Sequence, residues 1–303
     1  MTQRTKVDWL AGRTRAEPSE VVGRLVPMFG EAGEWLNLQH TGRGWMGYQS
    51  SATLRVAEMD VGMVAWGGAN QRDWTHISLT GQGCDWVGDW DTGQECLDTL
   101  GGWEPRRVDI ALDTFKRETS HEAVLAAYRA GGFTTRGRPP KLKQIIGEDP
   151  TDGRTIYVGT RTSDKFLRCY EKGLQLAEAQ GLTHIDGVAV SDWYRVELEV
   201  KAKDSPLPAD IIDRRDQYLA GSYPYLQQLL SDVEPEILVK TRERVPQLCL
   251  ADALAHIQTQ YGRTLFTALV AHHGDITAVW SKIVGRKHNP DMLRAGVLLV
   301  EHD

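Results

Sequence analysis

The 303-residue sequence has few cysteines and no long apolar run. Its four cysteines are scattered, without the CxxC spacing of a zinc module or the density of a disulfide scaffold. No stretch approaches the roughly 20 apolar residues that span a bilayer, and the N-terminus has no apolar signal core. These absences predict a protein that has no membrane partner and works in the reducing cytoplasm.

Several short motifs are missing as well. Neither GxGxxG nor a Walker phosphate-binding loop occurs, and GGAN at Gly67 to Asn70 is too short to replace them. The nine histidines include no His-hydrophobic-His triplet. His76 alternates with Trp74 and Ser78 in a predicted strand, where a metal or phosphate contact is a minor alternative to packing. The sequence thus predicts no built-in nucleotide-driven motor, and a metal site would rest on carboxylates.

Positive charge is local rather than general. The formal net charge is −6, which excludes a protein coated in positive charge. Between residues 129 and 172, however, ten Lys and Arg stand against five Asp and Glu. Nucleic acid responds to the nearby field, so this segment favours a DNA-binding groove.

The order of periodic segments predicts an α+β fold with a central antiparallel sheet and flanking helices. Short alternating runs broken by glycines fill much of the first 200 residues, with helical patterns between them. After Pro206 and Pro208 the periodicity becomes mostly helical. We therefore expect a domain at 1–205 and a smaller helical C-terminal domain at 206–303, which assists DNA binding or assembly.

Three predicted strands place ionic side chains on one face and apolar ones on the other. They read RVDIALD from Arg107, FLRCYEK from Phe166 and RVELEVK from Arg195. In the second strand, alternation puts Arg168, Tyr170 and Lys172 on one face. Positive charge beside a phenol favours the phenolate, which can attack a phosphodiester and hold the broken end covalently.

If the three strands are neighbours, their carboxylates form a cluster beside the tyrosine. These carboxylates are Asp109, Asp113, Glu197 and Glu199. Hard oxygen ligands suit Mg²⁺ or Mn²⁺, which would offset charge on a phosphate and help to lower the pKa of the phenol. The competing interpretation is a solvated sheet face with cross-strand ion pairs.

Basic residues before and within the tyrosine hairpin are candidate phosphate-backbone contacts. A ribbon interrupted by Pro139-Pro140 is predicted to be an edge or a loop, and a turn follows it. The candidates are Arg136, Arg138, Lys141, Lys143, Arg161 and Ser163, with the turn bringing the strand to be cut close to the tyrosine. A merely solubilising loop is the alternative.

The segments RRVDIALDTF, IYVGTRTSDKFLRCYEKG and WYRVELEVK together closely resemble the replication initiation factors of rolling-circle plasmids and filamentous phages. VDWL at Val7 to Leu10 and ISLTGQGC at Ile77 to Cys84 are similar to the phage branch in particular. The resemblance implies that Tyr170 nicks one strand of supercoiled origin DNA, keeps the 5′ phosphate and releases a 3′ hydroxyl. It also implies that Asp109, Asp113 and Glu197 hold the metal, with Glu199 less securely placed.

The sequence therefore predicts a rolling-circle replication initiator that nicks and closes one DNA strand. Tyr170 would attack, while Arg168 and Lys172 would stabilise charge. The expected partners are double-stranded origin DNA, the nicked single strand, a host helicase and polymerase, and a second copy in a homodimer. Two alternatives stay open: a hydrolytic nuclease that uses the carboxylates alone, and a DNA-binding regulator that is no longer catalytic.

Overall fold

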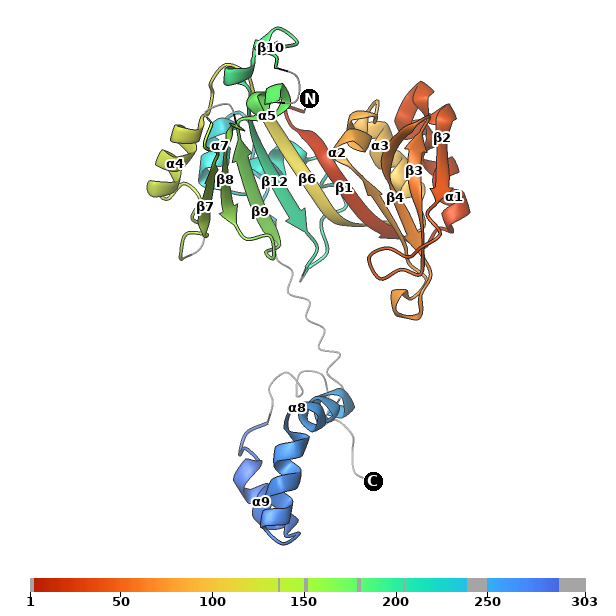
Figure 1. The fold of residues 1–303 in the computed structure, drawn as a ribbon, viewed down its shortest axis with the longest axis vertical. Coiled ribbons are helices and arrows are strands. Elements are labelled where there is room, and N and C mark those ends of the chain that lie inside the picture. The colour runs from red at the N-terminus through yellow and green to blue at the C-terminus, as the bar shows by residue number, and fades with distance from the viewer. Residues whose placement is uncertain are drawn as a thin grey trace. The chain divides into compact units, whose positions relative to one another are not determined.

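A ten-stranded antiparallel sheet organises the protein (Figure 1). The structure is a computed structural model and describes residues 3–135, 137–149, 152–178, 181–203, 205–238 and 250–288. The strand order is β2-β3-β4-β5-β1-β6-β12-β9-β8-β7. The strands in sequence are β1 (Lys6–Thr14), β2 (Leu36–His40), β3 (Ser50–Val56), β4 (Met59–Trp66), β5 (Thr75–Leu79), β6 (Glu104–Thr114), β7 (Leu142–Ile146), β8 (Arg154–Gly159), β9 (Lys165–Tyr170) and β12 (Tyr194–Lys201).

Short helices connect the strands. They are α1 (Pro18–Leu25), α2 (Gly81–Asp85), α3 (Trp90–Thr99), α4 (His121–Arg129), α5 (Lys172–Glu178), α6 (Arg215–Ala220) and α7 (Pro224–Leu229), with the 3₁₀ segments η1 (Val26–Trp35), η2 (Ala69–Gln71) and η4 (Val190–Asp192). A small hairpin pairs β10 (His184–Ile185) with β11 (Val188–Ala189). These elements confirm the predicted α+β class with a central antiparallel sheet.

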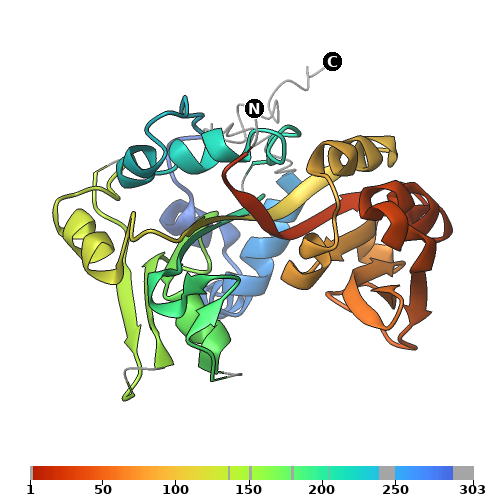
Figure 2. The same ribbon diagram turned by 90° about the horizontal axis from the view of Figure 1, so that it is seen from above.

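The apolar face of the sheet supplies the core. Alternation in β6 places Val108 and Ile110 in the interior, and Val196 and Leu198 of β12 join them. Side chains of α1, α3, α4, α6 and α7 belong to the same buried cluster. Figure 2 shows α6 and α7, in teal, together on one side of the sheet. The opposite face is left for the polar side chains.

The boundary between compact units differs from the predicted one near residue 205. The first unit is Met1–Thr241 and the second is Arg242–Asp303. Ile211, Leu219 and Leu230 are fully buried in the core of the first unit. The carboxylate of Asp216 also accepts hydrogen bonds from the backbone amides of Arg4 and Thr5, at 2.8 and 2.9 Å. Helical periodicity alone does not reveal this packing, so α6 and α7 belong with the sheet.

The second unit is helical, as predicted. It contains α8 (Leu250–Ala271) and α9 (Ile276–Ile283). The side chain of Asp275 caps α9 by accepting hydrogen bonds from the amides of Thr277 and Ala278. Across the described ranges, no helix is both long and apolar enough to cross a membrane.

Candidate active site

Strand β12 lies between β6 and β9, so the three strands predicted to be neighbours are neighbours. Residues directly opposite one another in a sheet share a face. The register gives three rows on the polar face: Asp113, Arg195 and Tyr170; Ala111, Glu197 and Arg168; and Asp109, Glu199 and Phe166. The sheet therefore brings an acidic group and the tyrosine together.

Tyr170 ends β9, and its hydroxyl donates a hydrogen bond to Oε2 of Glu197 at 3.1 Å. Burial raises the pKa of Tyr170 well above its ordinary value, and the negative charge of Glu197 raises it further. Arg195 and Arg168 lower that pKa without reversing the rise. The two arginines thus favour the phenolate, as predicted, but burial and Glu197 outweigh them and the net shift favours the phenol. Tyr170 is a phenol whose proton already points at a carboxylate.

Arg168 contacts two acids on the same face. Its Nη2 donates to Oε1 of Glu197 and lies 3.7 Å from Oδ2 of Asp109. Its Nε is buried and has no hydrogen-bond partner in the part of the chain that the structure describes. This guanidinium thus contacts both Asp109 and Glu197, the acceptor of the tyrosine's proton, and has an unused N–H that can donate to a phosphate.

Lys172 is not on the strand, contrary to the prediction from alternation. Strand β9 ends at Tyr170, and Lys172 is the first residue of α5. Its ammonium nevertheless lies 5.9 Å from the centroid of the Tyr170 ring. Burial lowers the pKa of Lys172, and the positive charge of Arg195 lowers it further. The turn at the strand end thus keeps a cation beside the tyrosine.

Asp109, Glu197 and Glu199 form a buried acidic group, with exposed fractions of 1%, 1% and 2%. Arg107 holds two of them together: its Nη2 lies 2.6 Å from Oδ2 of Asp109 and 2.8 Å from Oε2 of Glu199. Lys201 pairs with Oε1 of Glu199. Burial raises the pKa of Asp109 and of Glu197 despite their arginine partners. Burial thus outweighs the paired arginines at Asp109 and Glu197.

The donor chemistry of this group fits a hard divalent cation. Within the described ranges, no three His, Cys, Asp or Glu side chains are placed to ligate a metal ion. Arg107 and Arg168 pair with the carboxylates of this group. Oε1 of Glu199 is buried and makes no hydrogen bond, although it has its ion pair with Lys201. The chemistry of the donor set therefore suits Mg²⁺ or Mn²⁺, whereas the side-chain positions in this structure do not form a cation site.

Asp113 lies apart from the acidic group, so the predicted cluster of four carboxylates holds only three. Nε and Nη2 of Arg195 donate to its two oxygens, each at 2.7 Å, and Nε1 of Trp193 donates to Oδ1 at 2.8 Å. Burial would raise the pKa of Asp113, but these hydrogen bonds bring it below its ordinary value. Asp113 therefore anchors Arg195 beside Tyr170.

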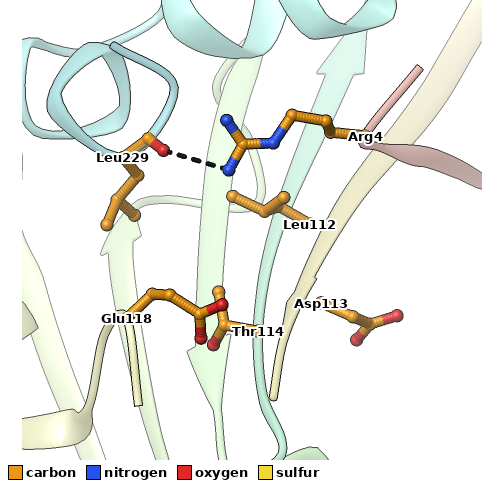
Figure 3. Close-up of a pocket in the computed structure, with 6 residues that line it drawn as sticks. All are labelled: Arg4, Leu112, Asp113, Thr114, Glu118 and Leu229. Carbon is orange, nitrogen blue, oxygen red and sulfur yellow. Dashed lines mark hydrogen bonds between the residues drawn. The ribbon is translucent and has the colours of Figure 1, made fainter. Parts of the chain in front are cut away.

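A pocket of about 230 Å³ borders β6 near Asp113 (Figure 3). Figure 3 shows the Asp113 carboxylate pointing away from Arg4 and Glu118. Arg4 is already paired with Asp232 at 2.6 Å. Of the residues that line the pocket, only Asp113 belongs to the rows that hold Tyr170. The pocket is therefore not the site of the tyrosine chemistry.

Asp8 is a site residue that the sequence pattern did not reveal. The register between β1 and β6 shifts between Val7 and Trp9, so Asp8 is the extra residue of a β-bulge. Its Oδ1 accepts a hydrogen bond from Nη1 of Arg195 at 2.7 Å, and its charge raises the pKa of both Tyr170 and Glu197. The one available signal was a carboxylate within the otherwise apolar VDWL segment.

The predicted DNA contacts lie in two places, neither next to Tyr170. Lys143 is exposed on β7, the edge strand of the sheet, as the basic ribbon predicted, and Arg138 and Lys141 are exposed just before it. Arg161 and Ser163 lie in the turn before β9, at the opposite end of that strand from Tyr170. The turn is thus separated from Tyr170 by the length of β9, and Arg136 lies outside the described residues.

His76 is packed between aromatic rings. Its ring centroid lies 5.4 Å from that of Trp45 and 5.9 Å from that of Tyr48. Burial lowers the pKa of His76 to about 4, with a further contribution from Arg106. The imidazole is thus neutral near pH 7.

We expect this shift to make stability depend on pH. The unfolded chain binds a proton at His76 near pH 6.5, whereas the folded chain does so only near pH 4, so stability falls as the pH drops between these values. The loss is about 3 kcal/mol at 1.36 kcal/mol per pKa unit. Urea unfolding of His76→Gln from pH 7 to 4 should show a flatter dependence than wild type. His184→Gln, at an exposed site, is the control and should keep the wild-type slope.

The chain is similar to known proteins in both sequence and fold. The sequence model of the replication initiation factor family matches residues 105–284, more than half of the chain. The protein named "Putative DNA relaxase NicK" of Bacillus subtilis (strain 168) is 27% identical over 150 residues, which are 45% of this chain and 40% of that relative's length. The rolling circle replication initiator protein from Geobacillus stearothermophilus has a similar fold. That structural match has a TM-score of 0.54 at 22% identity, and it covers 84% of this chain and 97% of the other.

The family match begins at Pro105 and thus includes β6, β9 and β12, the three strands that carry the tyrosine and the acidic group. On this match, the protein belongs to the replication initiation factor family.

Proposed function

We propose that the protein initiates rolling-circle replication by nicking and closing one strand of origin DNA through Tyr170. The observation that carries the proposal is the hydrogen bond from the Tyr170 hydroxyl to Oε2 of Glu197, with Arg168 and Lys172 close by. A phenol paired with a buried acceptor and flanked by cations is an arrangement for covalent attack on a phosphodiester. The family match supports this reaction.

In the first step Tyr170 gives its proton to Glu197 as its oxygen attacks the scissile phosphorus. Burial raises the pKa of Glu197, which makes this carboxylate a better proton acceptor than an exposed one. A bond forms between the tyrosine oxygen and phosphorus, and the bond from phosphorus to the 3′ oxygen breaks. The 3′ oxygen leaves and takes up a proton from water, while the 5′ phosphate stays on the tyrosine.

Arg168 and Lys172 have the complementary task of stabilising negative charge. Nη2 of Arg168 lies between Glu197 and Asp109, so this guanidinium can turn from a carboxylate to a phosphate oxygen. The ammonium of Lys172 approaches the ring of Tyr170 from α5. When a free 3′ hydroxyl attacks the phosphotyrosine, the same groups serve the reverse reaction, which reseals the strand.

A divalent cation completes the proposal. Asp109, Glu197 and Glu199 would hold Mg²⁺ or Mn²⁺, which would offset negative charge at the phosphate. Arg195 would not contact the phosphate, because Asp8 and Asp113 both bind its guanidinium. It would instead fix the position of the strand row that contains Tyr170. Asp8 and Asp113 are thus positioning residues for Tyr170.

The proposed reaction also implies a set of binding partners. The proposed partners are supercoiled origin DNA, the single strand released by nicking, a host helicase and polymerase, and a second copy of the chain. The contacts with duplex DNA on the β7 side would come from Arg138, Lys141 and Lys143.

The experiment is to incubate the protein with Mn²⁺ or Mg²⁺ and a candidate origin strand that carries a label on the 3′ side of the nick. The expected result is a labelled protein band on a denaturing gel, with the added mass on the peptide that contains Tyr170. Cleavage without an adduct would instead identify a hydrolytic nuclease. Binding without cleavage of any origin strand tested would identify a regulator.

A further inference from the structure

A second cluster on the polar face of the sheet combines arginines with aromatic rings. We call it the arginine–aromatic surface, and its members are Arg13, Arg15, Trp45, Tyr48, Trp74, His76 and Arg106. Arg13 and His76 lie on β1 and β5, Arg15 directly follows β1, and Arg106 is near the start of β6. The others lie in the loops before β3 and β5. None of them takes part in the chemistry proposed for Tyr170.

The register of the strands places this surface on the same face as Tyr170. Trp9 lies opposite Asp109, and by alternation Arg13 points to the same side of β1 as Trp9. Arg13 in turn lies opposite His76 of β5. At about 3.3 Å per residue, Arg13 is about 13 Å along β1 from Trp9. The acidic group and the arginine–aromatic surface therefore lie on the same face of the sheet.

On this surface, guanidinium groups lie over the faces of aromatic rings. The guanidinium carbons of Arg13 and Arg15 lie 4.1 and 3.7 Å from the centroid of the Trp74 ring. Trp45 and Tyr48 lie against His76. Between these rings and the acidic group, Arg107 lies over Trp9 at 4.9 Å. Guanidinium groups and aromatic rings are the side chains on which unpaired bases stack.

Positive charge on this surface exceeds what the acids nearby neutralise. Arg13 has an ion pair with Glu104 at 2.6 Å, but Arg106 forms no hydrogen bond or ion pair through its side chain among the residues that the structure describes. Burial lowers the pKa of Arg106, and so does the charge of Arg13. Glu104 partly offsets this effect on Arg106, but its carboxylate is already paired with Arg13, so two guanidinium groups share one acid and can bind an anion.

The backbone around Arg106 joins this surface to the basic turn before β9. The carbonyl of Arg106 accepts a hydrogen bond from the amide of Ala202 at 2.8 Å. On either side of Ala202, Lys201 and Lys203 donate to the carbonyls of Arg161 and Thr162, each at 2.9 Å. Cationic residues thus run from this turn to Arg106 and on to Arg13.

We propose that the arginine–aromatic surface binds the unpaired DNA strand beside the nick, with bases stacked on Trp74 and its neighbours and phosphate groups on Arg106 and Arg13. This inference rests on the proposed function, since the strand bound here would be the one that Tyr170 cuts on the same face of the sheet. Duplex DNA already stacks its bases internally, so half-buried rings and guanidinium planes that still reach the surface favour a single strand. A single strand offers bases to the rings and phosphates to the cations, so it would use both kinds of side chain on this surface.

The test measures binding apart from chemistry. A fluorescent 15-nucleotide oligothymidine and a duplex of the same length are titrated with full-length Tyr170→Phe protein, by fluorescence anisotropy at several salt concentrations. Adding Trp74→Ala or Arg106→Gln should weaken single-strand binding about tenfold, the effect of one lost base stack. Arg106→Gln should also reduce the salt slope by about 0.7. Circular dichroism and thermal unfolding check that each variant is folded.

Trp35→Ala is the matched control, since Trp35 is 63% exposed in η1, away from the surface, and it should leave both affinities unchanged. Single-strand affinity that is unchanged in folded Trp74→Ala and Arg106→Gln proteins would overturn the proposal. An equal or larger loss of duplex affinity would overturn it too, because the surface would then bind duplex. The proposed function is tested separately: if it is wrong, wild-type protein forms no covalent adduct with the origin strand, whatever the binding results here.

Discussion

Replacing Tyr170 by phenylalanine is expected to abolish the covalent protein–DNA adduct and to lower strand cleavage by on the order of 10³-fold or more. The substitution removes one oxygen, which is both the proposed nucleophile and the donor to Glu197. It leaves the ring and its contact with Lys172 in place. Cleavage and adduct are measured in parallel on a denaturing gel with a labelled origin strand.

Tyr157→Phe is the control for this prediction. Tyr157 lies opposite Arg168 on β8, so it is on the same face as Tyr170, and its ring packs against Phe166 at 5.2 Å. It should keep the wild-type adduct within about twofold, since its hydroxyl does not meet Glu197. Cleavage that survives in Tyr170→Phe without any adduct would assign the reaction to hydrolysis. An adduct lost in Tyr157→Phe instead would assign the nucleophile to the other tyrosine.

The strand pattern of the site could be predicted from the sequence, because ionic and apolar residues alternate in β6, β9 and β12 with few exceptions, such as Phe166. An inward apolar residue follows each ionic one in RVDIALD and RVELEVK, and that rule fixes the face of every side chain once the strands pair. Tyr170, Arg168 and Glu197 therefore lie on one face, as predicted. The two-residue period also predicted the α+β class and its antiparallel sheet.

Backbone irregularities hid the remaining parts of the site. Asp8 reaches Arg195 only because a bulge shifts β1 against β6, and a bulge leaves no period to detect. Lys172 was assigned to a strand that in fact stops at Tyr170. Helical periodicity after residue 205 also gave no sign that Leu219 and Leu230 pack under the sheet.

The pairing and the pKa values of the charged groups in the site could not be predicted from the sequence, for a different reason. A sequence shows which charges are present but not how they pair or how deeply they are buried. Asp113 was predicted to lie with Asp109 and Glu197, yet Arg195 occupies both of its oxygens. The pKa of Tyr170 was predicted to fall beside cations, whereas burial and Glu197 raise it. Burial outweighs the cations here because water no longer solvates a phenolate.

Replacing Glu197 by glutamine is expected to lower the nicking rate by about 10²- to 10⁴-fold while it lowers the pKa of Tyr170. The carboxylate raises that pKa through its charge, so a neutral amide of the same shape removes this effect and leaves Arg195 and Arg168 to favour the phenolate. The rate should fall all the same, because the amide cannot accept the proton that Tyr170 releases. Tyrosine ionisation is followed by absorbance, as the difference between Glu197→Gln proteins with and without Tyr170→Phe.

Glu199→Gln separates proton acceptance from metal binding. Glu199 belongs to the acidic group but forms no hydrogen bond with Tyr170, whose hydroxyl donates to Glu197. Its substitution should weaken the dependence of nicking on Mn²⁺ or Mg²⁺ and leave the pKa of Tyr170 close to the wild-type value. If Glu197→Gln nicked as fast as wild type once the pKa of Tyr170 had fallen, Glu197 would only hold the tyrosine protonated. The proton would then have another acceptor, and the first step would have to be reassigned.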